Sequence, residues 1–203
     1  MKYYVTSTTT NTKTGNIPTV WIGGNQEETL QSCMSAKCPL VPEKMSGKPV
    51  PKGMRPCYAW QGRVRHGLKS IGKAVMRMGE DPSSPDYEVP RRWNIRAALW
   101  KSARSARYLR LSAIGDPSAL AIEDVEDIET ACEEFDLGII GYTAGWRDAP
   151  HLRGKVMAST YSLEQADEAI EAGWRPAVVI SEDQGIEKFY TTPGGKKIPC
   201  SPV

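Results

Sequence analysis

The sequence predicts an α/β fold, a partial or small β/α barrel of five to six βα units within a single domain spanning residues 1–203. Two observations carry this prediction. From residue 109 onward, short β-type runs alternate with amphipathic helical stretches, and parallel strands require such helical crossovers. The first 60 residues instead carry three of the five cysteines among prolines and glycines, which predicts an irregular cysteine-bearing N-terminal loop region. An open doubly wound sheet is the alternative.

The N-terminal segment, residues 1–60, begins with two β-type runs. Residues 2–6 read as a first strand, and residues 17–22 form a short run whose Pro18 favours an edge position or an irregular start. Residues 41–54 hold three prolines and two glycines, so we expect a loop there. The cysteines of this segment are therefore expected in loops.

Residues 61–108 read as basic helices. Apolar residues recur at helical spacing from 58 to 78, with Lys and Arg between them. A second basic helix is expected from 91 to 108, after a break rich in Pro and Ser.

Residues 109–203 read as βα repeats. The expected strands and helices alternate as follows: strands at 109–114, 137–143, 156–160 and 177–180, and helices at 122–135 and 162–172. Ser162 followed by Gln165 predicts a capping box, and Gly173 predicts the end of that helix. Neither a G-x-G-x-x-G nor a G-x-x-x-x-G-K-[ST] motif follows any strand, so these nucleotide-binding loops are not predicted.

Four cysteines in loop-like sequence are the candidate metal ligands: Cys33, Cys38, Cys57 and Cys200. Four thiolates suit a 4Fe-4S cluster, which we favour, or a tetrahedral zinc ion as the alternative. Cys132 lies in helical sequence and is interpreted as a small buried residue. His66 or His151 is an alternative fourth ligand if Cys200 is not one. Free thiols, or disulfides in an exported protein, are the non-metal interpretations.

The expected strand ends carry polar residues that would meet at one rim of a β/α barrel. Asp116 is the candidate catalytic carboxylate, and its competing interpretation is a cap before Pro117. The candidate cofactor-binding residues are Gly115, Tyr142, Arg147 and Ser159.

Charge is distributed unevenly along the chain. Residues 44–110 contain 16 Lys/Arg and 4 Asp/Glu, whereas residues 111–187 contain 4 Lys/Arg and 17 Asp/Glu. The basic half predicts a surface for nucleic acid or an acidic host protein, or simply one face of a globule. No apolar run approaches the roughly 20 residues of a membrane span, and the N-terminus has no apolar signal region. We therefore expect a cytoplasmic protein without membrane contact, in a reducing compartment where clustered cysteines point to metal.

Several segments resemble a phage- and prophage-encoded family of unknown function that carries a Cys-Pro…Cys-Pro-Leu…Cys-Tyr-Ala pattern. The matching residues include Cys38-Pro39-Leu40, Cys57-Tyr58-Ala59, Gly115-Asp116-Pro117 and the run from Gly173 to Val179. That family is distantly similar to radical S-adenosylmethionine barrels, which bind a four-iron cluster after the first strand. The spacing 33/38/57 departs from their short three-cysteine run.

This resemblance implies a cytoplasmic, phage-related protein and supplies no established activity. Taken with the four loop cysteines, it leads us to expect a phage-encoded cluster-binding protein with redox or radical S-adenosylmethionine-like chemistry. If Cys200 completes the cluster, no iron is left open for S-adenosylmethionine, and the cluster is structural or electron-carrying. The alternative function is a non-catalytic phage protein that binds nucleic acid or a host defence component through residues 44–110, with a structural metal site.

Overall fold

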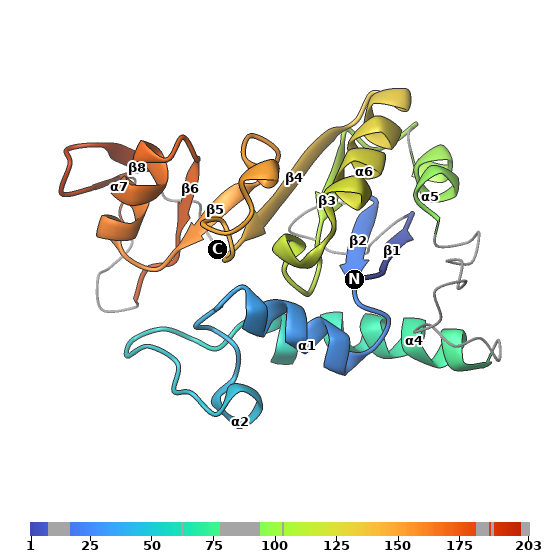
Figure 1. The fold of residues 1–203 in the computed structure, drawn as a ribbon, viewed down its shortest axis with the longest axis horizontal. Coiled ribbons are helices and arrows are strands. Elements are labelled where there is room, and N and C mark those ends of the chain that lie inside the picture. The colour runs from blue at the N-terminus through green and yellow to red at the C-terminus, as the bar shows by residue number, and fades with distance from the viewer. Residues whose placement is uncertain are drawn as a thin grey trace.

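A computed structural model describes residues 1–7, 17–61, 63–77, 94–102, 104–181, 187 and 189–199. Its centre is a six-stranded sheet whose strands lie in the order of the sequence (Figure 1). The strands are β1 Tyr3–Thr6, β2 Thr19–Ile22, β3 Tyr108–Leu111, β4 Gly138–Thr143, β5 Met157–Thr160 and β6 Pro176–Val178. β1 runs antiparallel to β2, and every later pairing is parallel. The α/β class is therefore as predicted.

Five strands, β2 to β6, form the parallel part of the sheet, joined in sequence order. The N-terminal strand β1 is an antiparallel neighbour of β2 and begins no βα unit, which corrects the expectation that it would. β2 starts one residue after Pro18 and lies between β1 and β3, so the irregular start is correct and the edge position is wrong. A sequential parallel order suits a partial barrel and an open sheet alike, and the barrel stays a prediction.

Helices connect and cover the strands. The helical segments are α1 Gln26–Ser35, α2 Glu43–Ser46, α3 Tyr58–Gln61, α4 Arg63–Arg77, α5 Ile95–Ser102, η2 Pro117–Ala119, α6 Ile122–Glu134, η3 Pro150–Leu152 and α7 Leu163–Glu171. A separate antiparallel hairpin follows, formed by β7 Phe189–Thr191 and β8 Lys197–Pro199. The sequence predicts a turn at residues 191–195, and in the structure that region joins the two strands of this hairpin.

Two expectations about the N-terminal half are wrong. Cys33 lies in α1, not in a loop, because the Asn25 side chain caps this helix by accepting from the Glu28 amide. The second basic helix ends at Ser102 rather than continuing to 108. The amides of Ser105 and Ala106 both donate to the Ser102 carbonyl, and this turn leads the chain into β3. Its first expected residues, 91–93, lie outside the described ones.

Helices α5 and α6 pack on one face of the sheet. Leu109 and Leu111 of β3 point to this face and pack in the main core with Leu99 of α5 and Ile128 of α6. This is the helix-covered face of the parallel sheet.

The opposite face is covered only in part. Trp21 of β2 lies beneath α4, close enough that a Cβ on Gly67 would stand 2.5 Å from the Trp21 ring. With Tyr4, Trp60 and Leu68, Trp21 belongs to a second core cluster that also contains Cys33. α4 thus covers the β1–β2 part of this face, while β3 and β4 present exposed side chains there.

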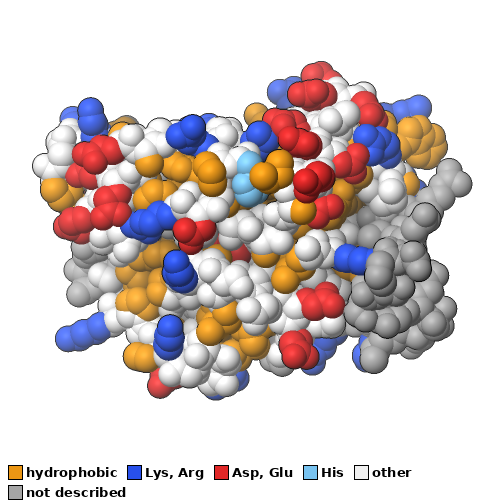
Figure 2. All heavy atoms as spheres, in the orientation of Figure 1, with side chains coloured by type: hydrophobic (Ala, Val, Ile, Leu, Met, Phe, Trp, Pro, Cys, Tyr) orange, Lys and Arg blue, Asp and Glu red, His pale blue; other side chains and the backbone are white. Residues whose placement is uncertain are grey.

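Figure 2 shows acidic side chains gathered over α6, with Lys and Arg scattered among other residues on the same side. The α6 sequence contributes Glu and Asp at seven of its thirteen positions, and three of these carboxylates pair with Arg96 of α5 or with Lys155. Among the described residues, no helix is both long and apolar enough to cross a bilayer.

Candidate functional site

Two local folds bring three cysteines into one neighbourhood. At the end of α1 the chain reverses at Lys37, whose φ is 55°, and the Cys38 amide donates to the Cys33 carbonyl at 3.1 Å. This is the bonding pattern of a Schellman turn. The Cys57 amide then donates to the Leu40 carbonyl at 2.8 Å, which sets the second cysteine loop beside the first. The Pro- and Gly-rich loop between them closes on itself through this bond.

The three thiols influence one another electrostatically. Burial, followed by negative charge on Cys38, Asp116 and Cys57, raises the pKa of Cys33 from 9.0 to about 12. Burial likewise raises the pKa of Cys38 and of Cys57. Negative charge on Asp116 also raises the pKa of Cys38, and negative charge on Cys38 raises that of Cys57. Without a bound cation, the site therefore holds its cysteines as neutral thiols.

Backbone amides point at two of the sulfurs. The amides of Leu40 and Val41 donate to the Cys38 sulfur and lower its pKa, and those of Ala59 and Trp60 do the same for Cys57. In both turns the donors lie two and three residues after the cysteine. Amide hydrogen bonds to sulfur favour the thiolate over the thiol, and they tune clusters held by cysteine.

Tyr161 is the site residue that sequence reasoning missed. It directly follows β5, and its hydroxyl lies 3.5 Å from the Cys38 sulfur. Its own amide donates to the Gln165 side chain at 3.0 Å, which fixes it at the start of α7. Burial, followed by the charge of Cys38, raises the pKa of Tyr161 well above its ordinary value, so the phenol stays protonated and able to donate to sulfur. Its position immediately after Ser159-Thr160, at a predicted strand end, was the available signal.

Asp116 lies at the C-terminal end of β3 and is 6% exposed. Its Oδ1 accepts from the Ser118 amide at 3.0 Å, the Ser118 hydroxyl at 2.8 Å and the Thr143 hydroxyl at 2.6 Å. Its Oδ2 accepts from the Ala144 amide at 2.7 Å. The carboxylate thus caps η2 and joins the ends of β3 and β4, which makes it a positioning residue in this structure.

The same turn is tied to α1. The Asp116 amide donates to the Ser32 hydroxyl at 2.9 Å, and Ser32 is the residue before Cys33. Gly115 has a φ of +88°, and a Cβ there would stand 2.8 Å from the Ile22 Cβ. Glycine is therefore required where the strand end approaches β2 and α1. The Gly115–Asp116 turn sets the position of the helix that carries Cys33.

The other predicted cofactor-binding residues lie in two places. Tyr142 is 53% exposed, and it shares with the half-buried Ser159 the sheet face opposite α6. Arg147 forms an ion pair with Glu168 of α7, and its guanidinium lies 4.0 Å from the centre of the Trp146 ring. Tyr142 and Ser159 are thus on the same side as Tyr161, whereas Arg147 is engaged with α7.

The remaining candidates are placed as follows. Cys200, the expected fourth ligand, lies outside the described residues. His66 is exposed on α4, and His151 lies on η3 with its Nε2 buried and without a hydrogen-bond partner among the described residues. Cys132 is buried in α6, as expected.

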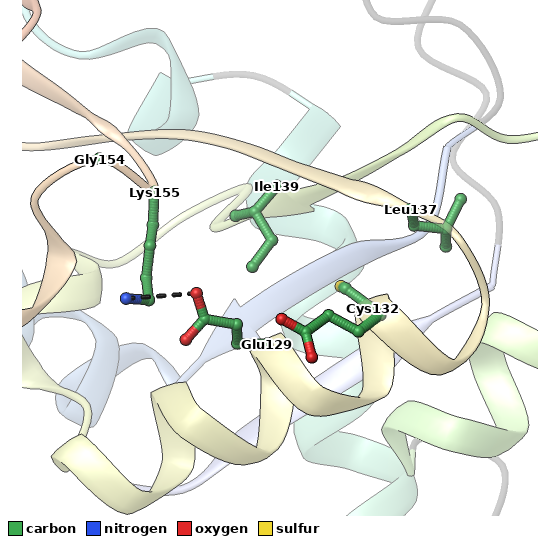
Figure 3. A pocket seen from close by; sticks show the side chains of 7 residues that line it. Glu129, Cys132, Leu137, Ile139, Gly154 and Lys155 are labelled. Carbon is green, nitrogen blue, oxygen red and sulfur yellow. Dashed lines mark ion pairs between the residues drawn. The ribbon is translucent and has the colours of Figure 1, made fainter.

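Cys132 also lines a shallow pocket of about 220 Å³ on the helix-covered side (Figure 3). Lys155 crosses this pocket to pair with Glu129 at 3.3 Å. Glu133 adds a second carboxylate to its lining, and the pocket contains none of the three clustered thiols.

Comparison with family models, with curated proteins and with solved structures finds no match to this chain. In the part of the chain that the structure describes, no three Cys, His, Asp or Glu side chains are set in the arrangement of a single metal ion's ligands. What the site offers is three neighbouring thiols, two of them bonded by backbone amides, beside a tyrosine hydroxyl.

Proposed function

We propose that the protein binds an iron–sulfur cluster, of the 4Fe-4S type, through Cys33, Cys38 and Cys57. The observation that carries the proposal is the gathering of these thiols by the Cys38–Cys33 and Cys57–Leu40 backbone bonds. Thiolates are the usual ligands of such clusters, and amide bonds to their sulfurs adjust the cluster's potential. The donor set fits a soft metal centre and includes no imidazole.

A zinc ion is the alternative occupant. Zinc binds sulfur at about 2.3 Å, so its thiolates converge on one point. A 4Fe-4S cluster places each thiolate on a different iron and suits a wider set. Cys33 lies on α1, Cys38 on the turn after this helix, and Cys57 just before α3. The three thiols thus come from separate segments while still influencing one another's charge, and such a set suits the cluster better than the single ion.

The fourth ligand of the cluster decides between two kinds of chemistry. With Cys200 as fourth ligand the cluster is structural or carries electrons. If only three protein ligands hold the cluster, one iron is open to a cosubstrate. In that case we propose radical S-adenosylmethionine-like chemistry. The second form draws support from position: Cys33 follows the first parallel strand, and Gly115-Asp116-Pro117 follows the second. Asp116 would then hold the rim in place, and Tyr161 would donate to the Cys38 thiolate.

Anaerobic purification followed by absorption spectroscopy tests the proposal. We expect brown protein with a broad band near about 400 nm, retained in Cys132→Ala and lost in Cys38→Ala. Colourless protein with stoichiometric zinc would show that a structural zinc ion, and not a cluster, occupies the site. Cys200→Ala separates the two chemistries, because loss of the cluster assigns Cys200 as a ligand. Retention of the cluster would leave one iron open.

A second candidate function is non-catalytic binding of nucleic acid or an acidic host protein through residues 44–110. It is favoured by α4, whose 15 residues include five Lys/Arg and no acidic residue. Two of these, Lys69 and Lys73, are exposed on the described part of the helix. Association that weakens steeply with added salt is the expected signature. Absence of binding at low salt would eliminate this function.

A further inference from the structure

One side of the sheet, here called the open face, carries exposed side chains at β3 and β4, beside the thiol site. In β3, the residues alternating with buried Leu109 and Leu111 are Tyr108 and Arg110. The parallel register pairs Tyr108 with Gly138 and Arg110 with Ile140 of β4. Tyr142, next on the same face, pairs with Met157 of β5. Because side chains alternate along a strand, these residues share the face opposite α5 and α6.

This open face carries large apolar and aromatic groups in contact with solvent. Tyr108 is 49% exposed, Ile140 38% and Tyr142 53%. Tyr108 is held flat against the strand next to it, since a Cβ on Gly138 would stand 2.8 Å from its ring. Exposed aromatic rings on an open sheet are platforms on which unpaired bases stack.

A positioned guanidinium lies among these rings. Arg110 donates through its Nε to the Ser112 carbonyl at 3.1 Å and through Nη2 to the Tyr58 hydroxyl at 2.7 Å. Both partners are neutral, and no carboxylate among the described residues pairs with Arg110, so its charge can hold an anion. Its field also lowers the pKa of Cys57. Strands β3 to β6 contain this one cation and no acidic residue.

The helix that adjoins the open face is also basic. α4 covers Trp21 on the adjoining strand β2, and Lys69 and Lys73 are exposed on this helix. The open face thus has exposed rings, a guanidinium between them and a neighbouring helix without acidic residues. These groups suit a chain of phosphates and bases. A single strand of nucleic acid uses both features, because its phosphates meet the cations and its bases stack on the rings.

We propose that single-stranded nucleic acid lies across the open face of β3, β4 and β5, with a phosphate at Arg110 and a base stacked on Tyr142. The proposal rests on the second candidate function and gives it a surface. It holds whether or not the neighbouring thiols carry a cluster.

Fluorescence anisotropy with a labelled single-stranded oligonucleotide tests this surface, using the full chain purified anaerobically. Arg110→Ala and Tyr142→Ala are compared with Lys101→Ala, an exposed cation on α5, and Trp100→Ala. Trp100 is 73% exposed on α5, on the other side of the sheet, and is the matched aromatic control. Thermal unfolding of each variant establishes that it is folded.

We expect Tyr142→Ala to weaken binding at least about 5-fold, since stacking of one base contributes about 1–3 kcal/mol. Arg110→Ala should weaken binding and reduce the salt slope by about 0.7, the value for one phosphate contact with a single strand. The two controls should bind as the wild type does. The proposed surface would be wrong if the control variants weakened binding equally, or if the protein bound a duplex or polyglutamate more tightly than the single strand. Absence of any binding at low salt would overturn both the surface and the function on which it rests.

Discussion

The replacement Asp116→Asn tests whether this residue holds the rim together or performs chemistry. Asparagine keeps one oxygen for Ser118 and Thr143 but turns an amide toward the Ala144 N–H, which donates to Asp116 at 2.7 Å. One charge-assisted hydrogen bond disappears, and two buried donors then face each other. Hydrogen bonds to charged groups contribute about 1.5–3 kcal/mol, and an unsatisfied buried donor costs about 1–3 kcal/mol. We expect the free energy of unfolding to fall by about 2–4 kcal/mol.

Urea unfolding followed by circular dichroism measures this change, and an unchanged slope against urea shows that the unfolded state is unaltered. Asp148→Asn is the matched control. Asp148 is a carboxylate with a 66% exposed side chain paired with Lys37, so its loss should change stability by about 1 kcal/mol or less. A change at Asp116 no larger than that of the control would refute the positioning role. Intact stability with lost activity would restore Asp116 as a catalytic candidate.

Three further predictions concern the same region. Gly115→Ala should destabilise the fold by about 2 kcal/mol or more in urea unfolding, since φ is +88° and the new Cβ meets Ile22. In the metal-free protein, the folded-state pKa of Cys33, about 12, lies above its ordinary value of 9.0. The stability linked to this thiol is complete below pH 9 and is lost as pH rises toward 12, by at most about 1.4 kcal/mol per pH unit. Stability curves of wild type and Cys33→Ala should therefore converge over that range. Arg147→Ala should change stability by about 1 kcal/mol or less and leave cluster content unchanged, because its pair with Glu168 is exposed.

Each of these has a contrary outcome. A neutral Gly115→Ala would mean that the turn tolerates a side chain and does not constrain α1. Parallel pH curves would show that Cys33 is not a buried neutral thiol. Loss of the cluster in Arg147→Ala would place that residue in the binding site, where the structure instead shows it engaged with Trp146 and α7.

The alternation of strand and helix was predictable after residue 108 because periods of two and of 3.6 residues differ clearly in that part of the chain. α7 illustrates this, as Ser162 does accept from the Gln165 amide at 3.2 Å and Gly173 follows the helix with a φ of +80°. The Gln165 side chain departs from an ideal capping box, because it accepts from Tyr161 rather than from Ser162.

The N-terminal half and the last strands were harder to predict, because their sequence signals are weak or depend on contacts between distant residues. α1 is rich in polar residues, so its helical period is weak, and only Asn25 and the reversal at Lys37 define its ends. The β7–β8 hairpin has three-residue strands, too short for a pattern. The contact of Tyr161 with Cys38 joins residues 123 positions apart, and no local rule reports it.

The central claim is that Cys33, Cys38 and Cys57 hold one inorganic centre, and iron and acid-labile sulfide per folded chain measure it most directly. Anaerobically purified wild type and Cys132→Ala should each contain about four iron and four sulfide, as a 4Fe-4S cluster requires. The double variant Cys38→Ala/Cys57→Ala should contain neither while keeping its circular dichroism. Wild-type protein free of iron and sulfide after anaerobic reconstitution, or a double variant that retains both, would contradict the account.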